Sequence, residues 1–201
     1  MLRESDAQTA FEAFYQKYAI SLPFAWMQEE VELLKAVAQN AHEKDDEPVI
    51  GIDQEFIFSP QFHFERLHEM CADPALKTVL EGWLKAEQQA YVDMQNGVSP
   101  DKLSVFMNLP LPTGWEELRS WFQAHHADEA LTILDAVQAS HVIYRHYVNE
   151  EYYDNNNVRA LLMRDYFYKA FQRVDSFNPE ARFVIKLGAN HVSRGFTSMG
   201  I

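Results

Sequence analysis

The residues most capable of chemistry stand near the C-terminal end of the sequence. His191 belongs to the turn Gly188-Ala189-Asn190-His191, which follows the β-branched run 182–187. Gly188 permits a sharp turn of the backbone, and Asn190 tolerates unusual dihedral angles. A histidine presented by such a turn can act as a general base, a metal ligand or an anion-binding group. The alternative interpretation is a histidine in an ordinary loop.

Arg164 is the second candidate, because its helical neighbours are apolar. Leu161, Phe167 and Phe171 share one face with Arg164 at spacings of three and four residues. An arginine that points inward needs a partner, since an unpaired buried charge is very costly. A carboxylate or a bound anion would supply that partner. The alternative is a guanidinium that leaves the edge of the apolar face and reaches water.

Two carboxylates follow an earlier apolar run. Asp53 ends the run 48–53, and Glu55 comes two residues later, so both side chains lean to one side of an extended chain. In open α/β sheets, ligands bind beyond the carboxyl ends of the strands. If the two apolar runs are parallel strands, we expect Asp53 and Glu55 to share a sheet edge with Asn190 and His191.

Hydrophobic periodicity predicts the elements that must position these groups. Helical spacing covers most of the chain, while the apolar runs 48–53 and 182–187 are typical of buried strands. The expected helices are 6–19, one after Pro23, one from Pro60, 74–94, one from Thr113, 128–149 and 157–177. A buried parallel sheet normally has at least three or four strands. The sequence therefore predicts a single helix-rich α/β domain over residues 1–201. Its small, mostly parallel sheet is flanked by helices and either hides further strands or is incomplete in this chain.

Composition narrows the classes of partner and location. The formal net charge is −13, which disfavours nucleic acid and anionic membranes because both need a basic protein surface. The one cysteine, Cys71, excludes an internal disulfide and a cysteine-based zinc site within one chain. The first residues lack the apolar run of a signal peptide, and no apolar stretch approaches the length of a membrane span. A cytoplasmic protein is expected.

The remaining histidines do not suggest a metal site. His63 and His68 are five residues apart, as are His141 and His146, and that spacing puts neither pair on one helix face. The sequence contains no HExxH, P-loop, GxGxxG or GxSxG motif. We therefore interpret these histidines as structural. A divalent metal is compatible with the chain, but no ligand set identifies one.

Two blocks of sequence resemble the C-terminal half of the erythromycin esterase-like proteins, within the wider group of ChaN and TraB/TIKI proteins. The blocks are 161–165, with its Arg164-Asp165 pair, and 183–192, with its Asn190-His191-Val192 turn. The resemblance spans roughly residues 26–194. It implies an α/β protein that hydrolyses an ester, such as a macrolide lactone, by activating water. Some members of the wider group use a metal, and ChaN binds haem.

The resemblance also implies roles for the candidate residues. His191 is expected to activate water, Arg164 to stabilise an oxyanion and Glu55 to orient the histidine. Asp53 and Asn190 are expected to contact a small-molecule substrate. The family's Gly-Glu-x-His turn after its first strand is not found here, so we expect a domain that lacks the family's N-terminal βαβ region.

The predicted function is thus a hydrolase of a carboxylic ester or related bond, with the chain either active alone or inactive as a partial domain. The alternative is a non-enzymatic ligand-binding or protein-interaction module. Its binding surface would come from aromatic-rich helices that carry Trp83, Trp115 and Trp121. An apolar patch exposed where further strands would dock would make the protein a homo-oligomer.

Overall fold

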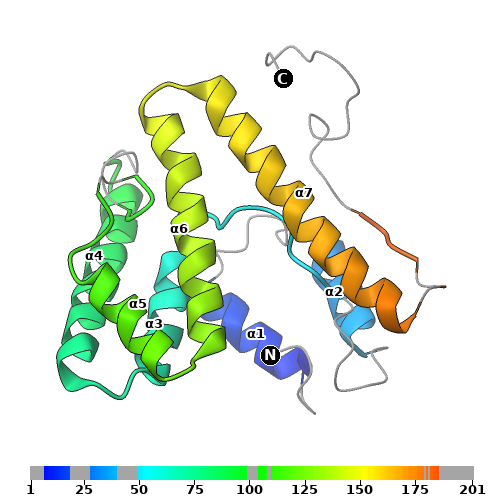
Figure 1. The fold of residues 1–201 in the computed structure, drawn as a ribbon, viewed down its shortest axis with the longest axis horizontal. Helices are drawn as coiled ribbons and strands as arrows, with labels where there is room; N and C mark the ends of the chain where they lie inside the picture. Colours follow the sequence, from blue (N-terminus) through cyan, green and yellow to red (C-terminus); the bar gives the residue numbers. More distant parts are fainter. Residues whose placement is uncertain are drawn as a thin grey trace.

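The computed structural model describes residues 7–18, 28–39, 49–98, 104–107, 110–178, 180 and 182–185. These residues form seven helices (Figure 1). The helices are α1 (Ala7–Tyr18), α2 (Gln28–Gln39), α3 (Pro60–Met70), α4 (Pro74–Gln95), α5 (Trp115–Ala124), α6 (Asp128–Val148) and α7 (Tyr152–Phe177). In this part of the chain, no helix is both long and apolar enough to cross a membrane.

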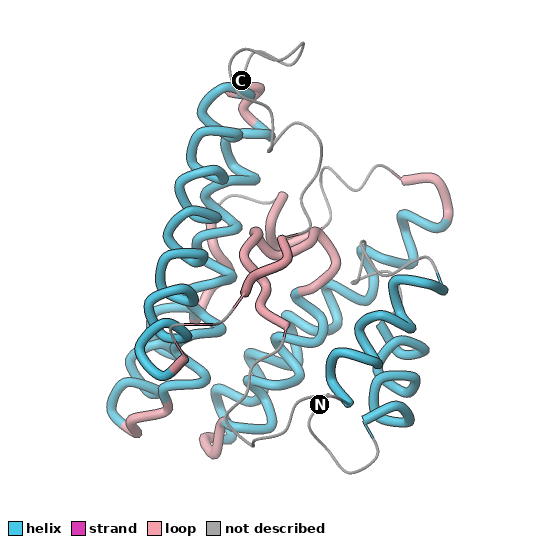
Figure 2. The backbone as a smooth tube through the Cα atoms, turned by 90° about the vertical axis from the view of Figure 1, so that its right-hand side faces the viewer, coloured by secondary structure: helices cyan, strands magenta, loops and turns pink. Residues whose placement is uncertain are grey.

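The predicted α/β fold is wrong, because the described residues contain helices and loops but no strand (Figure 2). Residues 49–56 and 182–185, which the sequence assigns to strands or their ends, have no regular secondary structure. The rings of Phe167 and Phe171 in α7 lie 6.0 and 5.6 Å from the ring of Phe183. An apolar β-branched run becomes a strand only when another backbone pairs with it. Among the described residues no backbone pairs with either run, and of residues 182–185 only Phe183 is seen to pack against helical side chains, while Val184 and Ile185 are exposed.

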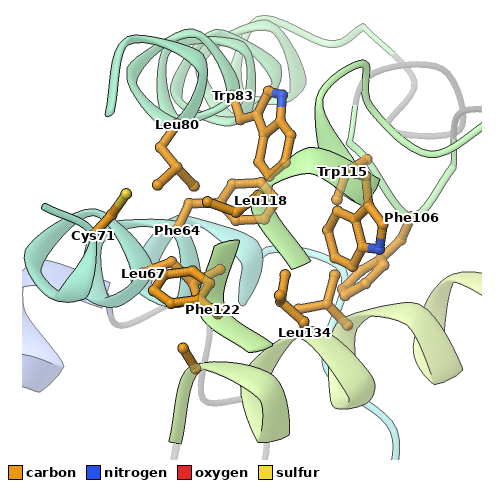
Figure 3. Close-up of a cluster of buried hydrophobic side chains, with 13 residues drawn as sticks. Phe64, Leu67, Cys71, Leu80, Trp83, Phe106, Trp115, Leu118, Phe122 and Leu134 are labelled. Carbon is orange, nitrogen blue, oxygen red and sulfur yellow. The ribbon is translucent and has the colours of Figure 1, made fainter. Parts of the chain in front are cut away.

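The core is built by α3, α4, α5 and α6, whose apolar faces meet around large side chains (Figure 3). Phe64, Leu80, Phe122 and Leu134 are completely buried, one from each of these helices in turn. Trp83 and Trp115 are also core residues, stacked with their ring centroids 5.7 Å apart. Both tryptophans are therefore packed in the core and offer little surface to a protein partner.

Local signals place several helix starts. Asp73 caps α4 by accepting hydrogen bonds from the amides of Ala75 and Leu76 at 2.8 and 3.0 Å, and Pro74 occupies the first turn. Pro60 stands in the first turn of α3 in the same way. In both helices, the residue pair read from the sequence marks the observed start.

Helix α7 begins five residues earlier than the sequence indicates, at Tyr152 and not at Asn157. The polar residues 154–156, which precede the predicted start, therefore lie inside α7. Asn155 donates from Nδ2 to the carbonyl of Ile143 in α6 at 2.7 Å, and Asn156 donates to the carbonyl of Tyr152 at 3.0 Å. Helices α6 and α7 are joined by a short turn and contact each other, and they diverge away from that turn (Figure 1).

Helix α1 attaches to this frame through α3. Tyr18 and Lys17 both donate hydrogen bonds to the carboxylate of Glu65. The ring of Phe62 lies 5.5 and 6.0 Å from the rings of Phe14 and Tyr18. Helix α2 contacts α1 and lies near the lower part of α7 in the view of Figure 1.

Candidate functional site

The segment 52–56, between α2 and α3, carries two carboxylates, Asp53 and Glu55, that each contact a basic side chain. Figure 1 shows the loop before α3 as a cyan trace that passes behind α6 and α7. Its backbone is held by Ser140 of α6, whose hydroxyl accepts a hydrogen bond from the amide of Glu55 at 2.8 Å. The same hydroxyl donates to the carbonyl of Ala136 at 2.8 Å. Ser140 is buried, so this contact fixes the position of Glu55 against α6.

Asp53 is joined to Arg159 of α7 by a bidentate ion pair. The guanidinium donates from Nε to Oδ1 at 2.7 Å and from Nη2 to Oδ2. The Asp53 carboxylate raises the pKa of Arg159, so the cation is permanent. Tyr144 of α6 lies beside this pair, and burial raises the pKa of its phenol to about 12.

Glu55 forms a second pair with His63 of α3. The Oε2 atom of Glu55 lies 2.7 Å from Nε2 of His63, and the side chains are 25% and 10% exposed. Burial by itself would raise the pKa of the Glu55 carboxyl, but the nearby His63 imidazole outweighs burial and holds that pKa below its ordinary value. Glu55 is therefore a carboxylate held in close contact with an imidazole nitrogen.

The structure brings together two of the predicted residues, Asp53 and Glu55, but with partners that the sequence did not suggest. Arg164 is exposed on α7. Asn190 and His191 lie outside the described residues, so their convergence with Arg164 stays a prediction. Arg159 occupies the inward, carboxylate-paired position that we expected for Arg164.

The error at Arg164 has a simple geometric cause. The inward face of α7 follows spacings of four, three and four through Arg159, Met163, Tyr166 and Ala170, which are buried or half-buried. Leu161 and Phe171, which we used to define the apolar face, are 44% and 40% exposed. Because α7 carries aromatic residues on several sides, the spacing of apolar residues does not identify a single inward face. A different choice of inward face, through Met163 and Ala170, would have placed Arg159 and not Arg164 towards the core.

His63 was interpreted as structural because its relation to His68 gave no two-ligand site. Its partner Glu55 lies in a loop eight positions earlier, and no periodic pattern relates a loop residue to a helix face. The one related signal in the sequence was the Ser59-Pro60 helix start. It places the first turn of α3, which carries His63, a few residues after Glu55.

A separate pocket of about 580 Å³ opens on the other side of α6. Leu111, Trp115 and Val142 provide apolar walls, while His141 and Arg145 provide polar groups. His141 follows Ser140 directly, so α6 presents one residue to the pocket and the preceding residue to the Glu55 segment.

Comparisons with protein-family models, with curated proteins and with solved structures find no match to this chain. The class of protein is therefore defined by its fold and its polar side-chain pairs. The described residues form a helical protein in which a non-helical segment carries a half-buried carboxylate–imidazole pair and a carboxylate–guanidinium pair.

Proposed function

We propose that this protein hydrolyses an ester or a related bond of a small molecule, with His63 as general base and Glu55 as the carboxylate that orients it. The observation that carries the proposal is the 2.7 Å contact between Glu55 Oε2 and His63 Nε2.

The chemistry follows from the charge state of the pair. The lowered pKa of Glu55 keeps this carboxyl ionised at neutral pH, so a carboxylate faces Nε2 of His63 at 2.7 Å. With Nε2 facing Glu55, Nδ1 is the ring nitrogen that would accept the proton from an attacking water. The resulting hydroxide would add to the carbonyl carbon of the ester. Collapse of the tetrahedral intermediate would break the bond to the alkoxide, which would take the proton back from Nδ1 of His63 and leave as the alcohol.

Arg159 would supply the positive charge for the tetrahedral intermediate. Its guanidinium is fixed by both oxygens of Asp53, which lies two residues from Glu55 on the same segment. A preorganised cation stabilises an oxyanion without rearrangement during the reaction. Arg159 thus takes the role that the sequence suggested for Arg164.

The test is turnover of a panel of p-nitrophenyl esters by the chain and by two histidine variants. General-base catalysis is typically worth about 10²–10⁴-fold, so His63→Gln should lose at least about 100-fold in kcat/KM. His68→Gln is the matched control, because His68 lies on the same helix in a more exposed pair with Glu81 at 3.3 Å. Equal turnover by the His63 variant and the parent, or no turnover by the parent above the buffer rate, would exclude this function.

The pocket beside α6 supports a second candidate, a non-enzymatic ligand-binding module. Its volume of about 580 Å³ suits a small molecule, and apolar walls with Arg145 and Gln138 nearby suit an amphipathic one. Binding of aromatic carboxylates that quenches tryptophan fluorescence in the parent and not in Arg145→Met would favour this candidate. For either function we propose a cytoplasmic location, which the presence of a single cysteine, Cys71, supports because the chain forms no internal disulfide.

A further inference from the structure

The turn between α6 and α7 gathers three side chains with metal-ligand chemistry. His146 comes from the last turn of α6, Glu151 immediately precedes α7, and Asp154 lies in the first turn of α7. One ligand atom from each, an imidazole nitrogen and two carboxylate oxygens, lies within 4.8 Å of the other two. Among the described residues, this is the one group of three such side chains.

The backbone of the turn is fixed by hydrogen bonds of its own. The amide of Glu151 donates to the carbonyl of His146 at 2.8 Å, and the amide of Glu150 donates to the carbonyl of Tyr147 at 3.0 Å. Asn155, one residue after Asp154, donates from its side chain to the carbonyl of Ile143 at 2.7 Å. The three ligands therefore stand on a backbone that binding does not have to order.

The spacing of the ligand atoms is near that of a metal shell. Bonds of about 2.0–2.2 Å from zinc to nitrogen and oxygen place neighbouring ligands roughly 3 Å apart. The Nδ1 atom of His146 and Oε2 of Glu151 lie 2.6 Å apart, and Asp154 is exposed and can rotate towards them. Small side-chain rotations would thus convert the hydrogen-bonded pair into a shell with three protein ligands.

We propose that His146, Glu151 and Asp154 bind one divalent transition-metal ion that staples α6 to α7. One imidazole with two carboxylates suits Zn²⁺, Ni²⁺ or Co²⁺, whereas Mg²⁺ and Ca²⁺ prefer shells of oxygen alone. Three protein ligands leave at least one position for water. The net charge of −13 increases the local concentration of cations around this exposed site.

The test is isothermal titration of the metal-free chain with ZnCl₂ and with CoCl₂. We expect one tight equivalent of Zn²⁺, weaker Co²⁺ with a visible absorption band, and no saturable binding of MgCl₂. The expected consequence for stability is a higher thermal midpoint in Zn²⁺, because the ion binds the folded turn. His146→Ala and Asp154→Asn should each weaken Zn²⁺ binding at least about tenfold while leaving the helical circular dichroism unchanged.

The control is His68→Ala, because His68 also faces a carboxylate, Glu81, at 3.3 Å but belongs to no group of three ligands. This variant should keep the tight equivalent. Zn²⁺ binding that is equal in the parent, His146→Ala and Asp154→Asn, or that is absent from the parent, would overturn the proposal. The result is independent of the hydrolase proposal, since ester turnover through His63 and Glu55 requires no ion at this turn.

Discussion

Arg159 and Asp53 stand 106 positions apart in the sequence, and their side chains form a bidentate ion pair that joins α7 to the segment before α3. The pair is three-quarters buried, with side chains 25% and 28% exposed. It is one of the contacts that hold the segment carrying Glu55 in place, together with the hydroxyl of Ser140.

Replacing one partner of this pair should destabilise the protein more than replacing both. Arg159→Met leaves the Asp53 carboxylate in a partly buried position without its cation, and we expect a loss of about 2 kcal/mol in the free energy of unfolding. That value lies between those of exposed and fully buried pairs. Urea denaturation measures it. The double variant Asp53→Asn with Arg159→Met should recover part of the loss.

Arg164→Met is the matched control, because Arg164 is exposed on the same helix. Its effect should stay within about 0.5 kcal/mol. A larger loss in Arg164→Met than in Arg159→Met would show that the ion pair contributes little to stability.

Glu87 gives the protein a predictable dependence on pH. Its side chain is buried in α4, with Oε1 accepting the amide hydrogen of Val105 at 2.5 Å. Burial raises the pKa of this carboxyl from 4.5 to about 7, against the opposing effects of the Val105 amide and the Ser104 hydroxyl. In the folded protein the carboxyl therefore stays protonated to near neutrality, while in the unfolded chain it ionises near pH 4.5.

The contribution of Glu87 to the free energy of unfolding is fully present below pH 4.5 and is lost as the pH rises to about 7. The difference between the two pKa values corresponds to about 3 kcal/mol. We expect Glu87→Gln to remove this component, since an amide keeps the acceptor for Val105 and does not ionise. Urea denaturation at pH 5 and pH 8 compares the two proteins. A loss of stability between these pH values that is the same in both would disprove the assignment.

Two glycines should respond to alanine in opposite directions. Gly82 lies within α4, and a Cβ there meets no atom within 4 Å, so Gly82→Ala should stabilise the protein by roughly 0.5–1 kcal/mol. Gly114 precedes α5 with a φ of +90°, and its Cβ would lie 2.9 Å from Cγ1 of Val79. Gly114→Ala should therefore destabilise by about 1–2 kcal/mol.

Thermal unfolding of the two glycine variants beside the parent checks both signs in one experiment. If Gly114→Ala had the higher midpoint, the left-handed backbone and the close approach of Val79 would both be in question.

The helices were predictable because their signals are local. The pair Asp73-Pro74 marks the start of α4, and α6 ends within one residue of its predicted limit, since a cap or a periodic face involves neighbours along the chain. The strands were not predictable for the opposite reason. The runs 48–53 and 182–187 have strand-like residues, but a strand exists only when a distant backbone pairs with it.

The amino-acid sequence alone determined the number and approximate limits of the described helices, the acidic net charge and the position of two carboxylates, Asp53 and Glu55, at the end of an apolar run. Tertiary structure decided which groups meet them. Arg159 and His63 reach the carboxylates because α7 and α3 pack on either side of one segment, and the rotation of each helix about its axis is set by contacts across the core. That rotation depends on how the helices pack together. Successive residues of an α-helix point about 100° apart around its axis, so a modest rotation decides which arginine faces inward and which faces water.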